Sequence, residues 1–195
     1  SGGTSLSGQA FSRGLTLDVR RHFRDIEILD AGQRVRVQPG ATVRQVNARL
    51  AKYHTKLGPE PASEIACTIG GMIANNSSGM TCGTTANTYR TIDSMVIALP
   101  SGTVIDTASP KAGEVLANQE PELVEVLTKL HTQLGRPEMR TDLQRRYSMK
   151  NTMGYGLNSF IDFDDPVKIL EHLMIGSEGT LGFVAEATLK TVPIH

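Results

Sequence analysis

Short alternations of apolar and polar residues, separated by turn residues, run through the first forty positions. A two-residue period over residues 15–19, 26–30 and 34–38 predicts three strands. Residues 31–33 between the second and third strands include a glycine, which favours a β-hairpin. Pro39-Gly40 then ends this part of the chain.

The second half carries a similar strand pattern. Residues 92–99 are mostly apolar and predict a strand, and Pro100-Ser101-Gly102 supplies a turn before a second strand at residues 103–106. Residues 183–189 alternate strictly, which predicts one more strand that ends before Pro193.

Helices are predicted where the apolar period changes to 3.6 residues. Thr42 and Gln45 form a capping-box pattern ahead of an amphipathic helix over residues 43–53. A second helix is predicted over residues 122–134 and a third over 166–172. Together these elements predict an α+β fold: a mostly antiparallel sheet of about five strands, flanked by helices.

One long segment, residues 58–83, follows neither period. A structureless connection of this size inside a compact domain is uncommon unless it has a function. No charged residue lies between Ile65 and Gly83, while glycines and polar amides and hydroxyls are frequent. The segment therefore suits a wall for a large, uncharged, planar ligand better than a phosphate clamp or a metal site.

Two shorter segments, residues 2–9 and 175–183, have a similar composition of glycine with small polar residues. Successive backbone N–H groups in the first of them can form a nest for an anion. It lacks the Lys of a nucleotide-triphosphate loop and the GxGxxG pattern. If all three segments converge, they form one backbone-lined groove for a dinucleotide, with its phosphates at residues 2–9 and its ring at residues 58–83.

Composition excludes several other classes of function. The 195 residues include 20 basic and 20 acidic side chains, so there is no electrostatic signature for binding nucleic acid. Two lone cysteines, Cys67 and Cys82, form no metal-ligand pattern and favour a reducing, cytoplasmic location. No transmembrane segment or signal peptide is found, and no metal ligands are nominated.

Five ordered motifs resemble a known family. They are GGTSLSGQA, PG at Pro39-Gly40, GPEPAS, TIGGMIANNSSG and IGSEGTLGFVAEATLKTVP. In this order they resemble the PCMH-type FAD-binding domain of the vanillyl-alcohol oxidase/p-cresol methylhydroxylase superfamily, and in particular its D-lactate/glycolate/2-hydroxyglutarate dehydrogenase branch. The stretches YRTIDSMVIALPSGTVIDTA and RYSMKNTMGYGLNSFIDFDDP resemble large members that add an iron–sulfur part.

The resemblance implies FAD as cofactor and assigns residues to it. The pyrophosphate loop would be Gly2, Gly3, Thr4, Ser5, Leu6, Ser7 and Gly8. The flavin and its ribityl chain would be lined by Pro61, Ala62, Ser63, Gly70, Gly71, Ala74, Asn75, Ser78 and Gly79. The later turn near the cofactor would be Glu178, Gly179, Thr180, Leu181 and Gly182.

In such enzymes FAD accepts a hydride at N5 from the carbon that bears the substrate hydroxyl. His54, His131 and His172 lie outside the ligand segments and are interpreted as surface or packing residues. Cys82 is interpreted as a small buried residue. Non-covalent FAD is therefore expected, and no residue of the chain is nominated as catalytic.

The chain resembles only part of a family member. It begins within the pyrophosphate loop and stops before the substrate (cap) domain, so residues 1–195 are expected to be a partial domain. The cap domain would bind the small 2-hydroxy acid, and electrons would pass to an iron–sulfur part or the quinone pool, at the inner membrane periphery in some members. Weak or no FAD binding by the chain alone is expected.

Two other functions remain open at this point. The first is a flavoenzyme like UDP-N-acetylenolpyruvylglucosamine reductase, which reduces its substrate with NADPH; the forms ANNSSG and GSEGTLG argue against it. The second is a non-catalytic domain that has kept the fold. Oxidation of a 2-hydroxy acid by the parent protein would exclude both.

Overall fold

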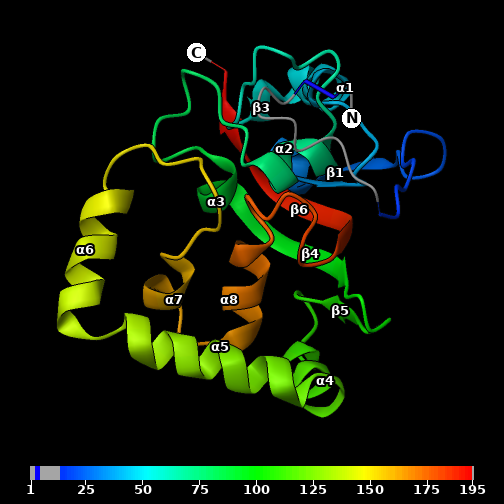
Figure 1. Cartoon of the computed structure of the whole chain (residues 1–195). Coiled ribbons are helices and arrows are strands. Elements are labelled where there is room, and N and C mark those ends of the chain that lie inside the picture. Colours follow the sequence, from blue (N-terminus) through cyan, green and yellow to red (C-terminus); the bar gives the residue numbers. More distant parts are fainter. Residues whose placement is uncertain (1–2, 5–13, 195) are drawn as a thin grey trace.

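The computed structural model describes residues 3–4 and 14–194, and its described strands form one antiparallel sheet (Figure 1). The strand order is β1-β2-β6-β4-β5, and β3 pairs with the last residues of β6. The strands are β1 (Ile26–Leu29), β2 (Arg34–Val37), β3 (Thr55–Leu57), β4 (Ile92–Ala98), β5 (Val104–Asp106) and β6 (Phe183–Pro193). The long strand β6 is therefore the centre of the sheet.

The predicted hairpin is confirmed. Strands β1 and β2 pair antiparallel from Ile26 opposite Val37 to Leu29 opposite Arg34. A single 3-10 turn joins them at Asp30–Gly32. Gly32 has φ +91, and a Cβ there would lie 2.4 Å from Cβ of Tyr53, so both the left-handed backbone and the close approach require glycine.

Helix α1 (Val43–Leu50) confirms the predicted capping box. The Thr42 hydroxyl accepts from the Gln45 N–H, and the Gln45 side chain accepts from the Thr42 N–H. Its apolar face is completely buried in the same core as strands β2 and β6. A 3-10 turn, Ala51–Tyr53, then continues to the predicted end of the element.

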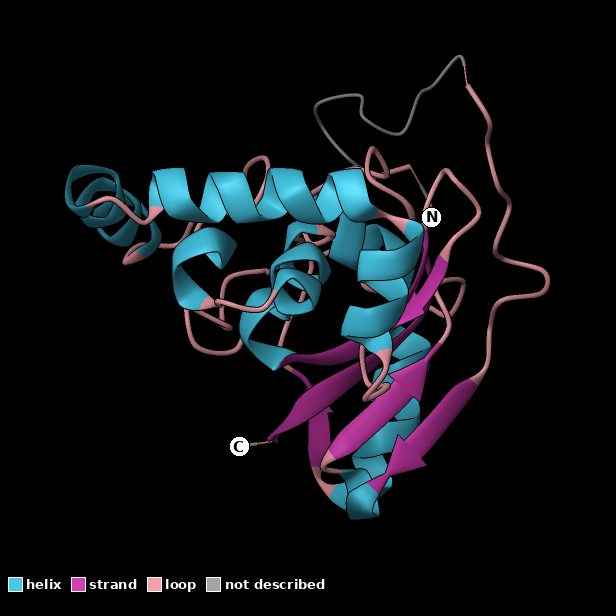
Figure 2. Cartoon of the chain, turned by 90° about the horizontal axis from the view of Figure 1, so that it is seen from below, coloured by secondary structure: helices cyan, strands magenta, loops and turns pink. Residues whose placement is uncertain are grey.

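Six further helices are grouped on the side of β4 and β5 (Figures 1 and 2). They are α3 (Thr88–Thr91), α4 (Ala112–Gln119), α5 (Pro121–Leu134), α6 (Pro137–Tyr147), α7 (Ser159–Asp162) and α8 (Pro166–Leu173). The predicted helices over 122–134 and 166–172 are confirmed as α5 and α8, each with proline in its first turn. None of the helices in the described ranges is long and apolar enough to cross a membrane.

The strand predicted over residues 15–19 is wrong. These residues form no strand and pair with no described strand, and Leu15 and Leu17 are 86% and 55% exposed. Their alternation therefore does not mark a face that the core buries. The sixth strand is instead β3, which follows the left-handed residue His54. It was not predicted because three residues are too few to show an alternation of apolar and polar positions.

The description of residues 58–83 as free of any period is also wrong. Helix α2 (Ile69–Asn75) lies within the segment, capped by the Thr68 hydroxyl, which accepts from the Gly71 N–H. Ile69, Met72 and Ile73 follow the i, i+3, i+4 spacing and are fully buried. The helix is only seven residues long and contains two glycines, which hide its period.

Candidate functional site

The exposed side of helix α2 forms a wall with almost no side chains. Gly70, Gly71 and Ala74 carry at most a methyl group, so a ligand can approach the helix backbone closely. A Cβ on Gly70 would lie only 2.7 Å from Cβ of Pro39. The small residues thus allow both the tight packing of α2 against the chain at Pro39 and an open, flat surface.

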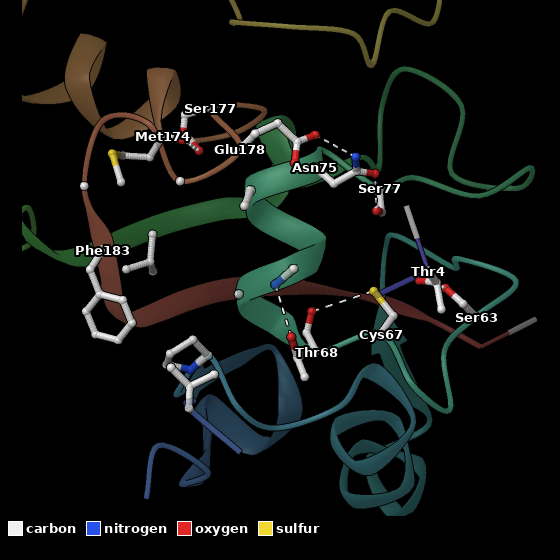
Figure 3. Close-up of a pocket in the computed structure, with 18 residues that line it drawn as sticks. Thr4, Ser63, Cys67, Thr68, Asn75, Ser77, Met174, Ser177, Glu178 and Phe183 are labelled. Carbon is white, nitrogen blue, oxygen red and sulfur yellow. Dashed lines mark hydrogen bonds between the residues drawn. The ribbon is translucent and has the colours of Figure 1, made fainter. Parts of the chain in front are cut away.

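This wall borders a cavity of about 340 Å³ (Figure 3), within the size range of small-molecule and cofactor sites. The cavity is built from several separate parts of the sequence. It is lined by Thr4, Val19, Pro39, Ser63, Cys67, Thr68, Gly70, Gly71, Ala74, Asn75, Ser77, Met174, Ser177, Glu178, Gly179, Gly182, Phe183 and Val184. Residues of all three glycine-rich segments therefore meet at this cavity, the first segment through Thr4.

Backbone hydrogen bonds fix the late glycine turn against α2. The Gly176 N–H donates to the Ile73 carbonyl and the Glu178 N–H donates to the Ala74 carbonyl, both at 2.9 Å. Gly176 has φ +85, and a Cβ there would lie 2.5 Å from the carbonyl oxygen of Gly154. The two walls of the cavity are consequently one connected unit of backbone.

A chain of side-chain hydrogen bonds crosses from α2 to this turn (Figure 3). The Ser77 hydroxyl donates to Asn75 Oδ1 at 2.9 Å, and Asn75 Nδ2 donates to Glu178 Oε1 at 2.7 Å. Glu178 has φ +53, a left-handed conformation that costs a non-glycine residue about 1 kcal/mol. Among the described residues that line the cavity, Glu178 is the only one that is charged at neutral pH.

Thr4, Ser63 and Cys67 bring two hydroxyl groups and a thiol to the cavity lining (Figure 3). The Thr4 and Ser63 hydroxyl oxygens lie 3.4 Å apart. Burial raises the pKa of the Cys67 thiol, so this side chain stays protonated at neutral pH and is a poor nucleophile. Cys82, in contrast, is buried outside the lining, in agreement with its interpretation as a small packing residue.

The first turn of α2 offers no free donors for an anion. The Ile69 N–H donates to the Ala41 carbonyl, the Gly70 N–H to the Pro39 carbonyl, and the Gly71 N–H to the Thr68 hydroxyl. No lysine or arginine lines the cavity in the described part of the chain. The α2 side therefore suits an uncharged part of a ligand, as the composition of residues 58–83 predicts.

The structure brings many of the predicted cofactor residues to this cavity. Those in its lining are Thr4, Ser63, Gly70, Gly71, Ala74, Asn75, Glu178, Gly179 and Gly182. Described residues that were also nominated but do not line it are Gly3, Pro61, Ala62, Ser78, Gly79, Thr180 and Leu181. Outside the described residues lie Gly2, Ser5, Leu6, Ser7 and Gly8.

Two of the nominated residues outside the lining have clear structural roles. Gly79 has φ +75, and a Cβ on it would lie 2.0 Å from the Glu60 carbonyl oxygen, so glycine allows the two backbone segments to lie side by side in a parallel bridge. The Thr180 hydroxyl forms a 2.6 Å hydrogen bond with the Tyr155 hydroxyl, which holds the late glycine turn from outside.

The histidines take packing or surface positions, as interpreted from the sequence. His172 is buried between the rings of Tyr89 and Phe163, and His131 bonds the Phe160 carbonyl. His54 is exposed and provides a left-handed turn before β3. None of the three lines the cavity.

Sequence reasoning missed about half of the cavity lining: Val19, Pro39, Cys67, Thr68, Ser77, Met174, Ser177, Phe183 and Val184. Thr68 could have been found as the cap of a helix with apolar residues one, four and five positions later. Phe183 packs edge-to-face on Phe23, 5.4 Å away, a contact between distant segments that no local pattern reveals.

Comparison with known families shows which family the chain belongs to. The family model described as "FAD binding domain" matches residues 1–108, which include α2 and its wall. The chain belongs to this family of FAD-binding domains. The resemblance carried by the glycine-rich motifs and the predicted α+β class are thereby confirmed.

Curated relatives match all or part of the FAD-binding chain. It is 31% identical to D-2-hydroxyglutarate dehydrogenase of Haemophilus influenzae over 99% of its own length and 19% of that protein. It is 38% identical to glycolate oxidase subunit GlcD of Escherichia coli K12 over 41% of its length and 16% of that subunit. The chain thus spans about a fifth of the length of these curated relatives.

A solved structure titled alkyldihydroxyacetonephosphate synthase has the same fold, with a TM-score of 0.55 at 18% identity. The match covers 98% of this chain and 26% of that one. At this level of identity the likeness supports the arrangement of elements only.

The described residues fit FAD as a cofactor. The flat, uncharged wall of α2 suits the ring, and the donor-bearing groups of the ribityl chain match the hydroxyl, amide and carboxylate side chains elsewhere in the cavity lining. A Cβ on Gly3 or Gly179 would contact nothing within 4 Å, so both residues border open space.

Proposed function

We propose that this chain forms the FAD-binding part of an oxidoreductase that dehydrogenates a 2-hydroxy acid such as D-lactate, glycolate or D-2-hydroxyglutarate. The observation that carries the proposal is the convergence of three glycine-rich segments on one uncharged wall, in a chain that belongs to the FAD-binding domains. The names of its relatives, a D-2-hydroxyglutarate dehydrogenase and a glycolate oxidase subunit, supply the substrate class.

In this proposal the chain binds and orients the cofactor, and FAD supplies the hydride acceptor. The wall of α2 covers one side of the ring and excludes water from it. The turn around Glu178 and Gly179 closes the cavity beside the wall, and the hydroxyl groups at the Thr4 end face the more polar half of the dinucleotide.

The substrate contacts belong, in this proposal, to other parts of a longer protein. Residues 1–195 would be a partial FAD-binding domain, completed by a substrate (cap) domain and an iron–sulfur part or another electron acceptor. The greater length of the relatives supports this division. Two unpaired cysteines, Cys67 and Cys82, support a cytoplasmic location, with association at the inner membrane surface as a further expectation.

The test is to purify the complete product of the gene and follow reduction of a dye acceptor with each of the three acids. We expect bound FAD and rapid dye reduction with at least one D-2-hydroxy acid, and no NADPH oxidation. Oxidation of NADPH with an enolpyruvyl sugar nucleotide would replace the proposal by the reductase alternative. Bound FAD without turnover of any of these substrates would favour the non-catalytic alternative.

A further inference from the structure

A second pocket, of about 340 Å³, lies beside the caps of α1 and α2 and shares one described residue, Thr68, with the cofactor cavity. We call it the arginine pocket. It is lined by Arg20, Arg24, Gly40, Thr42, Gln45, Ala66 and Thr68. No acidic residue of the described chain lines it. Its charge is therefore opposite to that of the cofactor cavity, whose described lining carries no arginine or lysine.

The segment that carries both arginines is held against Gly40. The Phe23 N–H donates to the Val19 carbonyl at 3.2 Å, and the Gly40 N–H donates to the Phe23 carbonyl at 2.7 Å. A Cβ on Gly40 would lie 2.0 Å from the Val19 carbonyl oxygen, so glycine is required for this close approach. The backbone that carries Arg20 and Arg24 is therefore fixed at the pocket.

The neutral polar side chains of the pocket have unused hydrogen-bond donors, because helix capping already uses their oxygens. Thr42 Oγ1 accepts from the Gln45 N–H, and Gln45 Oε1 accepts from the Thr42 N–H. Thr68 Oγ1 accepts from the Gly71 N–H, and a β-bridge holds Thr68 beside Thr42. Both hydroxyl hydrogens and the Gln45 NH₂ group lack an acceptor among the described residues. Thr68 is only 3% exposed, so its unused donor is a buried one.

One positive charge of the pocket is also unmatched. Arg20 forms an ion pair with Asp18, from Nη2 to Oδ2 at 2.9 Å. The Arg24 side chain has no ion-pair or hydrogen-bond partner among the described residues. The excess of donors belongs to side chains and not to a helix end, because the Val43 and Arg44 N–H groups donate to carbonyls elsewhere in the chain. Free donors around an unmatched cation favour an anion with several acceptor oxygens.

We propose that the arginine pocket binds a phosphate group that does not belong to FAD. The planar guanidinium of Arg24 can donate to two phosphate oxygens at once, and the Thr42 and Gln45 side chains donate to the others. The volume of the pocket is in the range of small-molecule sites, so a phosphate monoester fits as well as inorganic phosphate. This inference goes beyond the proposed function and holds whether or not FAD occupies its own cavity.

The test is calorimetric titration of the complete protein in excess FAD, at constant ionic strength, with inorganic phosphate and with glycerol 3-phosphate. Arg24→Gln removes the unmatched charge. The matched control is Arg140→Gln, which removes the same charge from an exposed position of α6 outside the pocket. We expect R24Q to weaken phosphate binding about tenfold or more, and R140Q to change it by less than about twofold.

The two probes distinguish the sources of the phosphate group. Tighter binding of glycerol 3-phosphate would identify a monoester as the ligand, and tighter binding of inorganic phosphate the free ion. Binding of neither probe would overturn the inference, and so would an R24Q protein with unchanged affinity. Phosphate binding that FAD abolishes would assign the pocket to the diphosphate of the cofactor and would overturn it as well.

A second pair of variants tests the sign of the ligand charge. Ala66 is a half-buried residue of the pocket lining. Ala66→Glu adds a carboxylate there, whereas Ala66→Gln adds a neutral side chain of the same size. We expect A66E to bind phosphate at least tenfold more weakly than A66Q, because like charges repel at a partly buried site. Equal affinities of A66E and A66Q would show that the pocket holds no anion.

Discussion

The cofactor cavity and a cluster of side chains around α8 both place polar groups in buried surroundings, but they treat those groups in opposite ways. The α8 cluster consists of Tyr89, Thr107, Lys168, Glu171 and His172. The polar side chains of this cluster have hydrogen-bond partners within the chain. In the cavity, by contrast, no described residue donates to Oε2 of Glu178, and none covers the face of α2 formed by Gly71 and Ala74.

The α8 cluster is a closed network. Glu171 is fully buried, accepts from the Thr107 hydroxyl, and pairs with Lys168 Nζ at 3.0 Å. Burial raises the pKa of Glu171, and burial lowers the pKa of His172 to about 4. Lys168 also donates to the Asp93 carbonyl, which ties α8 to strand β4.

Strongly perturbed pKa values often mark functional sites. Here Glu171 and His172, whose pKa values burial shifts, lie in the part of the molecule whose polar groups are paired internally. The cavity is recognised by the reverse features: small residues, few charges and unused hydrogen-bonding capacity. The comparison predicts that changes in the cavity alter cofactor binding, while changes in the α8 cluster alter stability.

The largest expected effect comes from filling the cavity. Ala74→Phe would place a ring on the open face of α2, where FAD is proposed to lie. We expect FAD affinity to fall by about 100-fold or more, about 2.7 kcal/mol, with a change in unfolding free energy below about 1 kcal/mol. Fluorescence titration of the complete protein with FAD measures the first effect and urea unfolding the second.

The matched control for this variant is Ala117→Phe, at an exposed position of helix α4 outside the cavity. It should bind FAD normally. If A74F also bound FAD normally, the cofactor would have to lie away from α2, and the distinction between the two regions would fail.

The next effect is on stability. Lys168→Met leaves the buried carboxylate of Glu171 without its charged partner, and we expect a loss of about 3 kcal/mol in unfolding free energy with unchanged FAD affinity. The double variant Lys168→Met/Glu171→Met removes both charges and should recover most of that loss. A double variant no more stable than K168M would contradict the pairing. Urea unfolding at pH 7 gives all three values.

The third effect depends on pH. The pKa of His172 is lowered from 6.5 to about 4, so the fold favours the neutral ring. Its contribution to stability is complete above pH 6.5 and is lost as the pH falls through 4. Between pH 7 and pH 4 the unsubstituted protein should lose about 3 kcal/mol more unfolding free energy than His172→Phe.

The phenylalanine keeps the ring contacts with Tyr89 and Phe163 but cannot be protonated. Comparing the two proteins also cancels the titration of Glu171 and Asp162, which lie near the ring and are present in both. If the unfolding free energies of the unsubstituted protein and of His172→Phe fell by the same amount between pH 7 and pH 4, protonation of His172 would not destabilise the folded state, and the prediction would be wrong.

The sequence predicted the elements whose signals are local. Helix α1 was recognisable because Thr42 and Gln45 cap it and its apolar positions follow the helical period. Strand β6 was recognisable because its alternation is long. Residues 15–19 carry an equally regular alternation, but no described strand pairs with them, and such pairing is a tertiary property that a local pattern does not contain.

The candidate site shows the same limit. Glycine-rich composition pointed to the cavity, and nine of the nominated residues line it. The hydrogen bond between Asn75 and Glu178 joins residues 103 positions apart, and only the folded chain reveals it. Helix α2 was hidden because the small residues that make it a flat wall also weaken the pattern by which helices are recognised.

The most direct test of the central claim is a crystal structure of the complete protein with FAD bound. The account predicts that the flavin ring contacts the face of α2 formed by Gly71 and Ala74, with the diphosphate at the end near Thr4. A flavin bound elsewhere, or a diphosphate beside Glu178, would contradict it.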